Sequence, residues 1–139
     1  MRRIYAGFCG VGKSTLIAKK QNLKIIEFEC WKYRGVNFPS NYIKDILRAY
    51  DENYTVLIST DRVVINIINS LGIEITLVYP DKELKEEYIT KYKERGSHKD
   101  FINVLINHWE DWILELEQDT INKHIVFTNK DMNLALVVK

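Results

Sequence analysis

The feature that most constrains the fold is a glycine-rich segment near the start of the chain. Gly7-Phe8-Cys9-Gly10-Val11-Gly12-Lys13-Ser14 matches the Walker A pattern G-x-x-x-x-G-K-[ST] at every fixed position. Residues 3–6 before it are typical of a short buried strand, and residues 14–20 after it are typical of the first turns of a helix. The order of strand, glycine loop and helix predicts a loop that binds phosphate through backbone N–H groups.

Each residue of this loop has an expected role. The backbone N–H groups expected to converge on phosphate belong to Gly10, Val11, Gly12 and Lys13. The Lys13 ammonium is expected to contact the β- and γ-phosphates and to face solvent when no phosphate is bound. The Ser14 hydroxyl is the expected Mg²⁺ ligand, and Thr15 is expected to contact an α-phosphate.

Length and composition exclude several classes of protein. The 139 residues suffice for one domain, 1–139, and the net charge of +1 argues against a nucleic-acid groove or a membrane-surface domain. No apolar run approaches the roughly 20 residues of a membrane span, and Met-Arg-Arg leads directly into the first strand without the pattern of a signal peptide. Cys9 and Cys30 lack metal-ligand spacing, and a disulfide at Cys9 would block the expected phosphate loop, so a reducing cytoplasm is the simplest interpretation.

Hydrophobic periodicity predicts alternating strands and helices. Strands are predicted at 4–6, 23–29, 54–59, 73–78 and 124–128, the fourth being stopped by Pro80. Helices are predicted at 14–20, 41–50, 61–71, 81–95 and 100–118, with a helix or extension at 132–138. This alternation indicates an α/β fold with a parallel sheet covered on both faces, in which ligands bind beyond the carboxyl ends of the strands.

Acidic and aromatic residues follow the second predicted strand. Glu27 and Glu29 are two apart and share a face of a strand, so they are either polar groups of an edge strand or ligands of substrate or Mg²⁺-bound water. Glu29, nearer the strand tip, is the preferred candidate. Residues 30–34, Cys-Trp-Lys-Tyr-Arg, form either a surface loop or a site for a planar or anionic acceptor.

The third predicted strand ends near a further acid. Asp61 comes two residues later than a Walker B aspartate would, so an N-cap of the following helix is preferred over a Mg²⁺ role.

A basic cluster surrounds Gly96. The cluster is either a solvated helix end or a mobile cationic lid that closes over phosphates. It spans about 91–99 and contains Lys91, Lys93, Arg95, His98 and Lys99. In the next helix, Trp109 and Trp112 are expected in the core, and His108 and His124 are expected to be structural.

Several segments together resemble a known family. Besides the loop, they are Val56-Leu57-Ile58-Ser59-Thr60, residues 76–88, Lys91-Tyr92-Lys93-Glu94-Arg95-Gly96 and the stretch 107–112. The chain resembles small P-loop kinases such as shikimate, gluconate and nucleoside monophosphate kinases. It is most similar to short adenylate-kinase-like P-loop proteins of Gram-positive bacteria and their phages.

This resemblance implies a fold and a set of site residues. It implies a three-layer P-loop NTPase sandwich with strand order 2-3-1-4-5. It places Arg95 as a lid arginine, Glu29 as an acceptor ligand, and Asn129 and Lys130 beside adenine. The family's paired lid arginines are reduced here to one arginine plus lysines, and few arginines are available for an acceptor phosphate: Arg34, Arg48 and Arg62.

The expected activity is transfer of the γ-phosphate of ATP, with Mg²⁺, to a small acceptor, a nucleotide or nucleoside being favoured. Lys13, Arg95, Glu29 and Asp61 are the candidate catalytic residues, and Glu29, Arg34 and Arg62 the candidate acceptor ligands. The alternative is a nucleotide-binding ATPase or switch that acts through a protein partner. The oligomeric state stays open.

Overall fold

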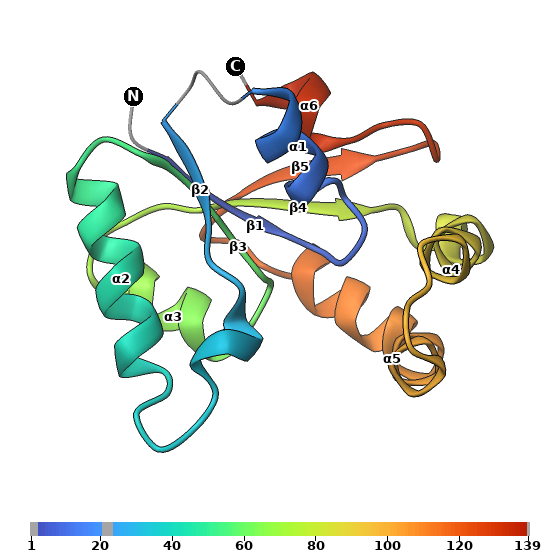
Figure 1. Ribbon diagram of the computed structural model, residues 1–139, viewed down its shortest axis with the longest axis horizontal. Helices are drawn as coiled ribbons and strands as arrows, with labels where there is room; N and C mark the ends of the chain where they lie inside the picture. Colours follow the sequence, from blue (N-terminus) through green and yellow to red (C-terminus); the bar gives the residue numbers. More distant parts are fainter. Residues whose placement is uncertain (1–2, 21–23, 139) are drawn as a thin grey trace.

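The computed structural model describes residues 3–20 and 24–138, and its centre is one five-stranded parallel sheet (Figure 1). The strands are β1 (Arg3–Gly7), β2 (Ile25–Glu27), β3 (Thr55–Ile58), β4 (Thr76–Pro80) and β5 (Lys123–Phe127). Their order is β2-β3-β1-β4-β5, and every neighbouring pair is parallel. The expected α/β class, parallel sheet and strand order are therefore confirmed.

Helices lie on both sides of the sheet. The α-helices are α1 (Lys13–Lys19), α2 (Ser40–Asp51), α3 (Arg62–Ser70), α4 (Lys85–Glu94), α5 (Lys99–Glu117) and α6 (Leu134–Val137). Two 3₁₀ turns, η1 (Cys30–Tyr33) and η2 (Lys82–Leu84), precede α2 and α4. In Figure 1, α1 and α6 lie on one side, and α2, α3 and α5 lie on the other, with α4 beyond the carboxyl end of β4. None of the described helices is long and apolar enough to cross a membrane.

The central strands are buried on both faces. Ile4 and Val56, which pair in the register of β1 and β3, are at most 1% exposed on one face. The next pair, Tyr5 and Leu57, faces the opposite side of the sheet and is at most 4% exposed. Burial on both faces explains why these strands read as continuous apolar runs. The same register brings the carboxyl ends of β1 and β3 to one edge of the sheet.

Two strands, β2 and β4, differ from the predictions by more than one residue at their ends. The fourth strand was expected to stop before Pro80, but β4 includes Pro80. Pairing of β4 with β1 ends at Val78, so the N–H that proline lacks is not needed on the side that faces β1. On the other side Pro80 pairs with Phe127 of β5. The second strand is shorter than expected: Leu23 lies outside the described residues, and the chain turns into η1 after Phe28.

Candidate functional site

The segment Gly7–Ser14, called here the glycine loop, connects β1 to α1 through a tight turn. Gly10 and Gly12 have φ values of 90° and 98°, which side-chain-bearing residues rarely adopt. A Cβ on Gly7 would lie 2.8 Å from Cγ2 of Val11, whose side chain is fully buried under the loop. Both fixed glycines of the pattern, Gly7 and Gly12, therefore occupy positions where a side chain would be sterically unfavourable. The Val11 N–H donates to the carbonyl of Phe8 at 3.2 Å.

Lys13 folds back onto the loop. Its Nζ donates to the carbonyl oxygen of Gly7 at 2.7 Å, and burial lowers the pKa of this ammonium against the opposing attraction of Glu27. The expectation that Lys13 faces solvent was wrong, because the loop offers the ammonium a carbonyl partner within reach. An incoming phosphate would compete with the Gly7 carbonyl for this group.

Ser14 lies next to an acid that was not the preferred candidate. The Ser14 hydroxyl donates to Oε1 of Glu27 at 3.5 Å, a long contact, and burial raises the pKa of Glu27 although nearby Lys13 opposes the shift. Glu29 instead forms an ion pair with Lys32 at 3.1 Å. Glu27 is therefore the carboxylate beside the expected metal ligand.

A cavity of about 1220 Å³ opens from the glycine loop along the carboxyl edge of the sheet. The predicted site residues that line it are Gly10, Gly12, Lys13, Ser14, Thr15, Glu29, Arg34, Asp61, Arg62 and Arg95. The crevice expected from the strand ends is present for β1, β2 and β3. Val11, Asn129 and Lys130 do not line it.

The segment after β5 lies beside the glycine loop rather than in the cavity. Asn129 is exposed, and its Oδ1 accepts a hydrogen bond from the N–H of Asp131 at 3.0 Å. Asn133 lies against the loop: a Cβ on Gly12 would lie 3.1 Å from the Cβ of Asn133. The backbone N–H of Leu134 donates to the Val11 carbonyl at 2.9 Å. The sequence analysis missed Asn133, since it carries no pattern of its own.

Helix α4 packs directly on the glycine loop. The hydroxyl of Tyr92 donates to the Cys9 carbonyl at 2.7 Å, and a Cβ on Gly10 would lie 3.0 Å from the Tyr92 ring and 3.2 Å from the Tyr88 ring. Tyr88 and Tyr92 are both fully buried. Their spacing of four residues places both rings on one helix face, a signal that the sequence analysis did not use.

The basic cluster around Gly96 forms a compact helix corner. Gly96 and Ser97 donate to the carbonyls of Lys93 and Tyr92, the two bonds of a Schellman motif that ends α4. Of the cluster, only Lys91 and Arg95 line the cavity. The Arg95 guanidinium lies 5.1 Å above the Tyr92 ring, and its Nε donates to the Ser97 hydroxyl at 3.0 Å.

Asp61 has two partners. Its Oδ1 accepts the N–H of Val64 at 3.2 Å, which confirms the N-cap of α3, and its Oδ2 pairs with Arg34 at 3.2 Å. One carboxylate therefore both starts a helix and neutralises an arginine of the cavity wall.

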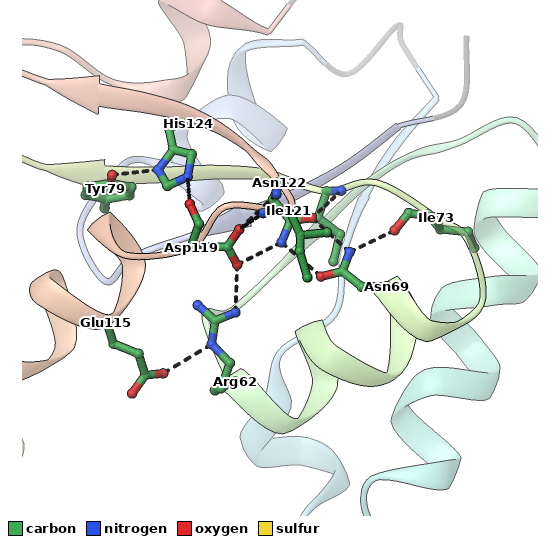
Figure 2. A network of polar contacts seen from close by, with 10 residues as sticks. Arg62, Asn69, Ile73, Tyr79, Glu115, Asp119, Ile121, Asn122 and His124 are labelled. Carbon is green, nitrogen blue, oxygen red and sulfur yellow. Dashed lines mark hydrogen bonds and ion pairs between the residues drawn. The ribbon is translucent and has the colours of Figure 1, made fainter.

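Arg62 is held by two carboxylates in a polar network (Figure 2). Its Nη1 lies 2.8 Å from Asp119 and its Nε lies 3.3 Å from Glu115. Burial alone would raise the pKa of Asp119, but hydrogen bonds from Arg62 and Asn122 outweigh it and hold this pKa well below its ordinary value. Arg62 thus ties α3 to the end of α5.

The same network explains His124. Its Nε2 lies 2.8 Å from the Asp119 carbonyl oxygen and its Nδ1 lies 2.7 Å from the Tyr79 hydroxyl (Figure 2). These contacts join β4 and β5 to the loop after α5, as expected of a structural histidine.

Aromatic side chains form the part of the cavity wall contributed by η1 and α5. Trp31 is 70% exposed, and Trp112 is 38% exposed and stacks on His108 with the ring planes 13° apart. Phe28 and Phe101 line the same cavity. Trp109 is 1% exposed and its Nε1 donates to the Lys82 carbonyl, as expected of a core residue, but the core assignment of Trp112 was wrong.

Within residues 3–20 and 24–138, no three His, Cys, Asp or Glu side chains are arranged to hold a metal ion. The Ser14 hydroxyl and Glu27 carboxylate are hard oxygen donors, which suit Mg²⁺ bound partly by substrate phosphates. No protein-family model, curated protein or solved structure compared with the chain matches it.

Proposed function

We propose that the protein is an ATP- and Mg²⁺-dependent phosphotransferase that moves the γ-phosphate to the hydroxyl group of a small acceptor. The observation that carries this proposal is the cavity itself. It runs from the glycine loop to an aromatic wall, and about 1220 Å³ exceeds the roughly 300–1,000 Å³ of a typical single-ligand pocket. That volume suits a nucleotide and an acceptor bound together.

The glycine loop is the donor side of the proposed site. Lys13 exchanges the Gly7 carbonyl for the β- and γ-phosphates, and the glycine backbone lets those phosphates approach closely. Ser14 and Glu27 would supply oxygen ligands for Mg²⁺, which would neutralise phosphate charge. Arg95, on the exposed end of α4, reaches toward charge that develops during transfer.

Two carboxylates stand between donor and acceptor. Glu27 and Glu29 both line the cavity near the end of β2, and Glu29, the one not assigned to Mg²⁺, can receive the proton of the acceptor hydroxyl. The remaining contribution is positioning, because phosphoryl transfer asks for little covalent chemistry from the protein.

The test compares two lysines of the same helix. Lys13→Ala removes the phosphate-binding ammonium, and Lys19→Ala removes an exposed lysine of α1 that does not line the cavity. Calorimetry of ATP–Mg²⁺ binding should show at least about a tenfold loss for Lys13→Ala and no change for Lys19→Ala. Equal affinities in all three proteins would remove the ATP site from the glycine loop.

Turnover separates transfer from hydrolysis. With radiolabelled ATP, a phosphotransferase releases ADP in proportion to labelled acceptor. ADP release that no acceptor in a panel of nucleosides, nucleotides and sugar acids accelerates or captures would contradict the proposed transfer.

A further inference from the structure

The charges and rings of the acceptor side of the cavity restrict what binds there. We propose that the acceptor is an uncharged molecule with a planar heteroaromatic ring and an alcohol, the class represented by nucleosides, and not a phosphate monoester or a sugar acid. This inference rests on the proposed phosphotransferase function and names its acceptor.

The first support is the aromatic wall. Trp31, exposed to 70%, and Trp112, exposed to 38%, come from different elements and line one cavity together with Phe28 and Phe101. Large exposed aromatic side chains in a cavity are typical of sites that stack flat rings. His108 stacks on Trp112 at a centroid distance of 5.1 Å and fixes the orientation of its ring before any ligand binds.

The second support is the state of the two arginines on the acceptor side. Arg34 pairs with Asp61 at 3.2 Å, and Arg62 pairs with Glu115 and with Asp119 at 3.3 and 2.8 Å. A phosphate monoester carries about 1.5–2 negative charges at neutral pH. A phosphate bound here would lie beside Asp61 and Glu115, which line the same cavity and already neutralise these arginines, so a neutral acceptor is favoured.

The other cations that line the cavity in the described part of the chain belong to the donor side. They are Lys13 in the glycine loop, and Lys91 and Arg95 on α4, the helix that packs on that loop through Tyr92. ATP itself brings the negative charge that these three groups balance. No further cation of the lining remains for a second anionic group.

The reaction is balanced without another reactant. The acceptor hydroxyl oxygen forms a bond to the γ-phosphorus, and the bond from that phosphorus to the β,γ-bridging oxygen breaks. The electron pair of the broken bond leaves with ADP, and the hydroxyl proton passes to the carboxylate of Glu29 and then to solvent. The products are ADP and the phosphorylated alcohol.

The experiment presents the intact chain and labelled ATP–Mg²⁺ with nucleosides, their 5′-monophosphates, gluconate, shikimate and a 5′-hydroxyl oligonucleotide. Phosphorylation of one or more nucleosides, with kcat/KM at least about tenfold above that of the matching monophosphate, is expected. Preferred use of a monophosphate or sugar acid would overturn the inference but leave the transferase proposal intact. Preferred use of the oligonucleotide would replace a small acceptor by a nucleic-acid end.

Variants test the wall independently. Trp31→Ala and Trp112→Ala should each raise the KM for the nucleoside about 5- to 100-fold, the range expected for loss of one stacking contact. Leu114→Ala on the same helix is the control, because Leu114 is half exposed and does not line the cavity. An unchanged KM in both tryptophan variants would refute the stacking site.

Asp61→Asn tests the charge argument. Asparagine is an equally good N-cap, so α3 should still form, but Arg34 loses its carboxylate partner. The ratio of monophosphate use to nucleoside use should rise about fivefold, whatever the overall rate. An unchanged ratio would show that neutralisation of Arg34 does not exclude phosphate. If ATP binds through Lys13 but no acceptor is phosphorylated, and no nucleoside quenches tryptophan fluorescence with an ATP analogue bound, both proposals fail.

Discussion

Replacing Gly10 by alanine tests whether α4 and the glycine loop form one packed unit. The new Cβ would lie 3.0 Å from Cε1 of Tyr92 and 3.2 Å from Cδ2 of Tyr88. Neither ring is free to move aside: the Tyr92 hydroxyl is hydrogen-bonded to the Cys9 carbonyl, and Tyr88 packs on Trp109 with centroids 5.6 Å apart. The substitution therefore adds crowding to backbone strain.

Gly96→Ala provides a control that isolates the strain. Gly96 has φ of 76°, close to the 90° of Gly10, but a Cβ there would meet nothing within 4 Å. Backbone strain costs about 1–2 kcal/mol at either position, and crowding adds about 1–3 kcal/mol at Gly10 alone. We expect Gly10→Ala to lower the free energy of unfolding by about 2–5 kcal/mol, against about 1–2 kcal/mol for Gly96→Ala.

Urea denaturation, monitored by circular dichroism, measures the loss in free energy of unfolding of both variants on the same scale. For a chain of 139 residues, each kcal/mol corresponds to about 3 °C in Tm, so thermal melting gives a second measurement. Equal losses in the two variants would refute the close packing of α4 on the glycine loop. A larger loss in Gly10→Ala without any loss of ATP affinity would show that the packing serves stability alone.

Three further results are expected. Arg95→Ala should lower kcat far more than it weakens ATP binding, and Arg95→Lys should restore kcat in part. Hydrogen exchange should show that residues 91–99 gain protection when an ATP analogue binds. If turnover and protection are both unchanged, this segment is a solvated helix end and not a lid. Tyr92→Phe removes the bond to Cys9 and should cost about 1 kcal/mol of stability, measured by urea denaturation; no loss would mean that water replaces it. The lowered pKa of Asp119 contributes stability at neutral pH that is lost as pH falls below about 4, so Asp119→Asn should flatten the acid limb of stability against pH; an unchanged limb would refute this linkage.

The parallel sheet and the tight turn of the glycine loop could be predicted because local patterns carry them, whereas the strand order was implied only by the resemblance to P-loop kinases. Buried parallel strands leave continuous apolar runs, and the glycines of the loop occupy positions where a side chain would clash or strain the backbone. The presence of Pro80 led to a wrong prediction of where β4 ends. Whether a proline ends a strand depends on whether a neighbouring strand needs an N–H hydrogen bond from that residue.

The sequence could not show which of Glu27 and Glu29 lies beside Ser14, for a geometric reason. Side chains two apart share a face only while the strand continues, and β2 ends at Glu27. Glu29 has already left the strand as the residue before η1, where Lys32 becomes its ion-pair partner. The alternation of side chains along a strand therefore could not show which acid lies beside Ser14.

Trp112 was misplaced because two tryptophans three residues apart fit one apolar stripe. The buried stripe of α5 instead runs through Leu105, Trp109, Ile113 and Leu116. Ile113 takes the core position, so Trp112, one residue earlier, is turned about 100° away toward the cavity. When a helix has one more apolar residue than its buried stripe can hold, the sequence predicts that one apolar side chain is exposed. It does not predict which of them is exposed.

Pairing of charges is the property hardest to predict from sequence, and the proposed choice of acceptor rests on it. Arg62 and Asp119 are 57 residues apart, and Arg34 and Asp61 are 27 apart, so counting arginines overstated the cations available to an acceptor. Once these partners are placed, the acceptor side offers rings and hydrogen-bonding groups, whereas the donor side keeps Lys13, Lys91 and Arg95. In the proposed phosphotransferase, the carboxylates that already pair with these arginines would disfavour a second anionic molecule and would not oppose a neutral acceptor.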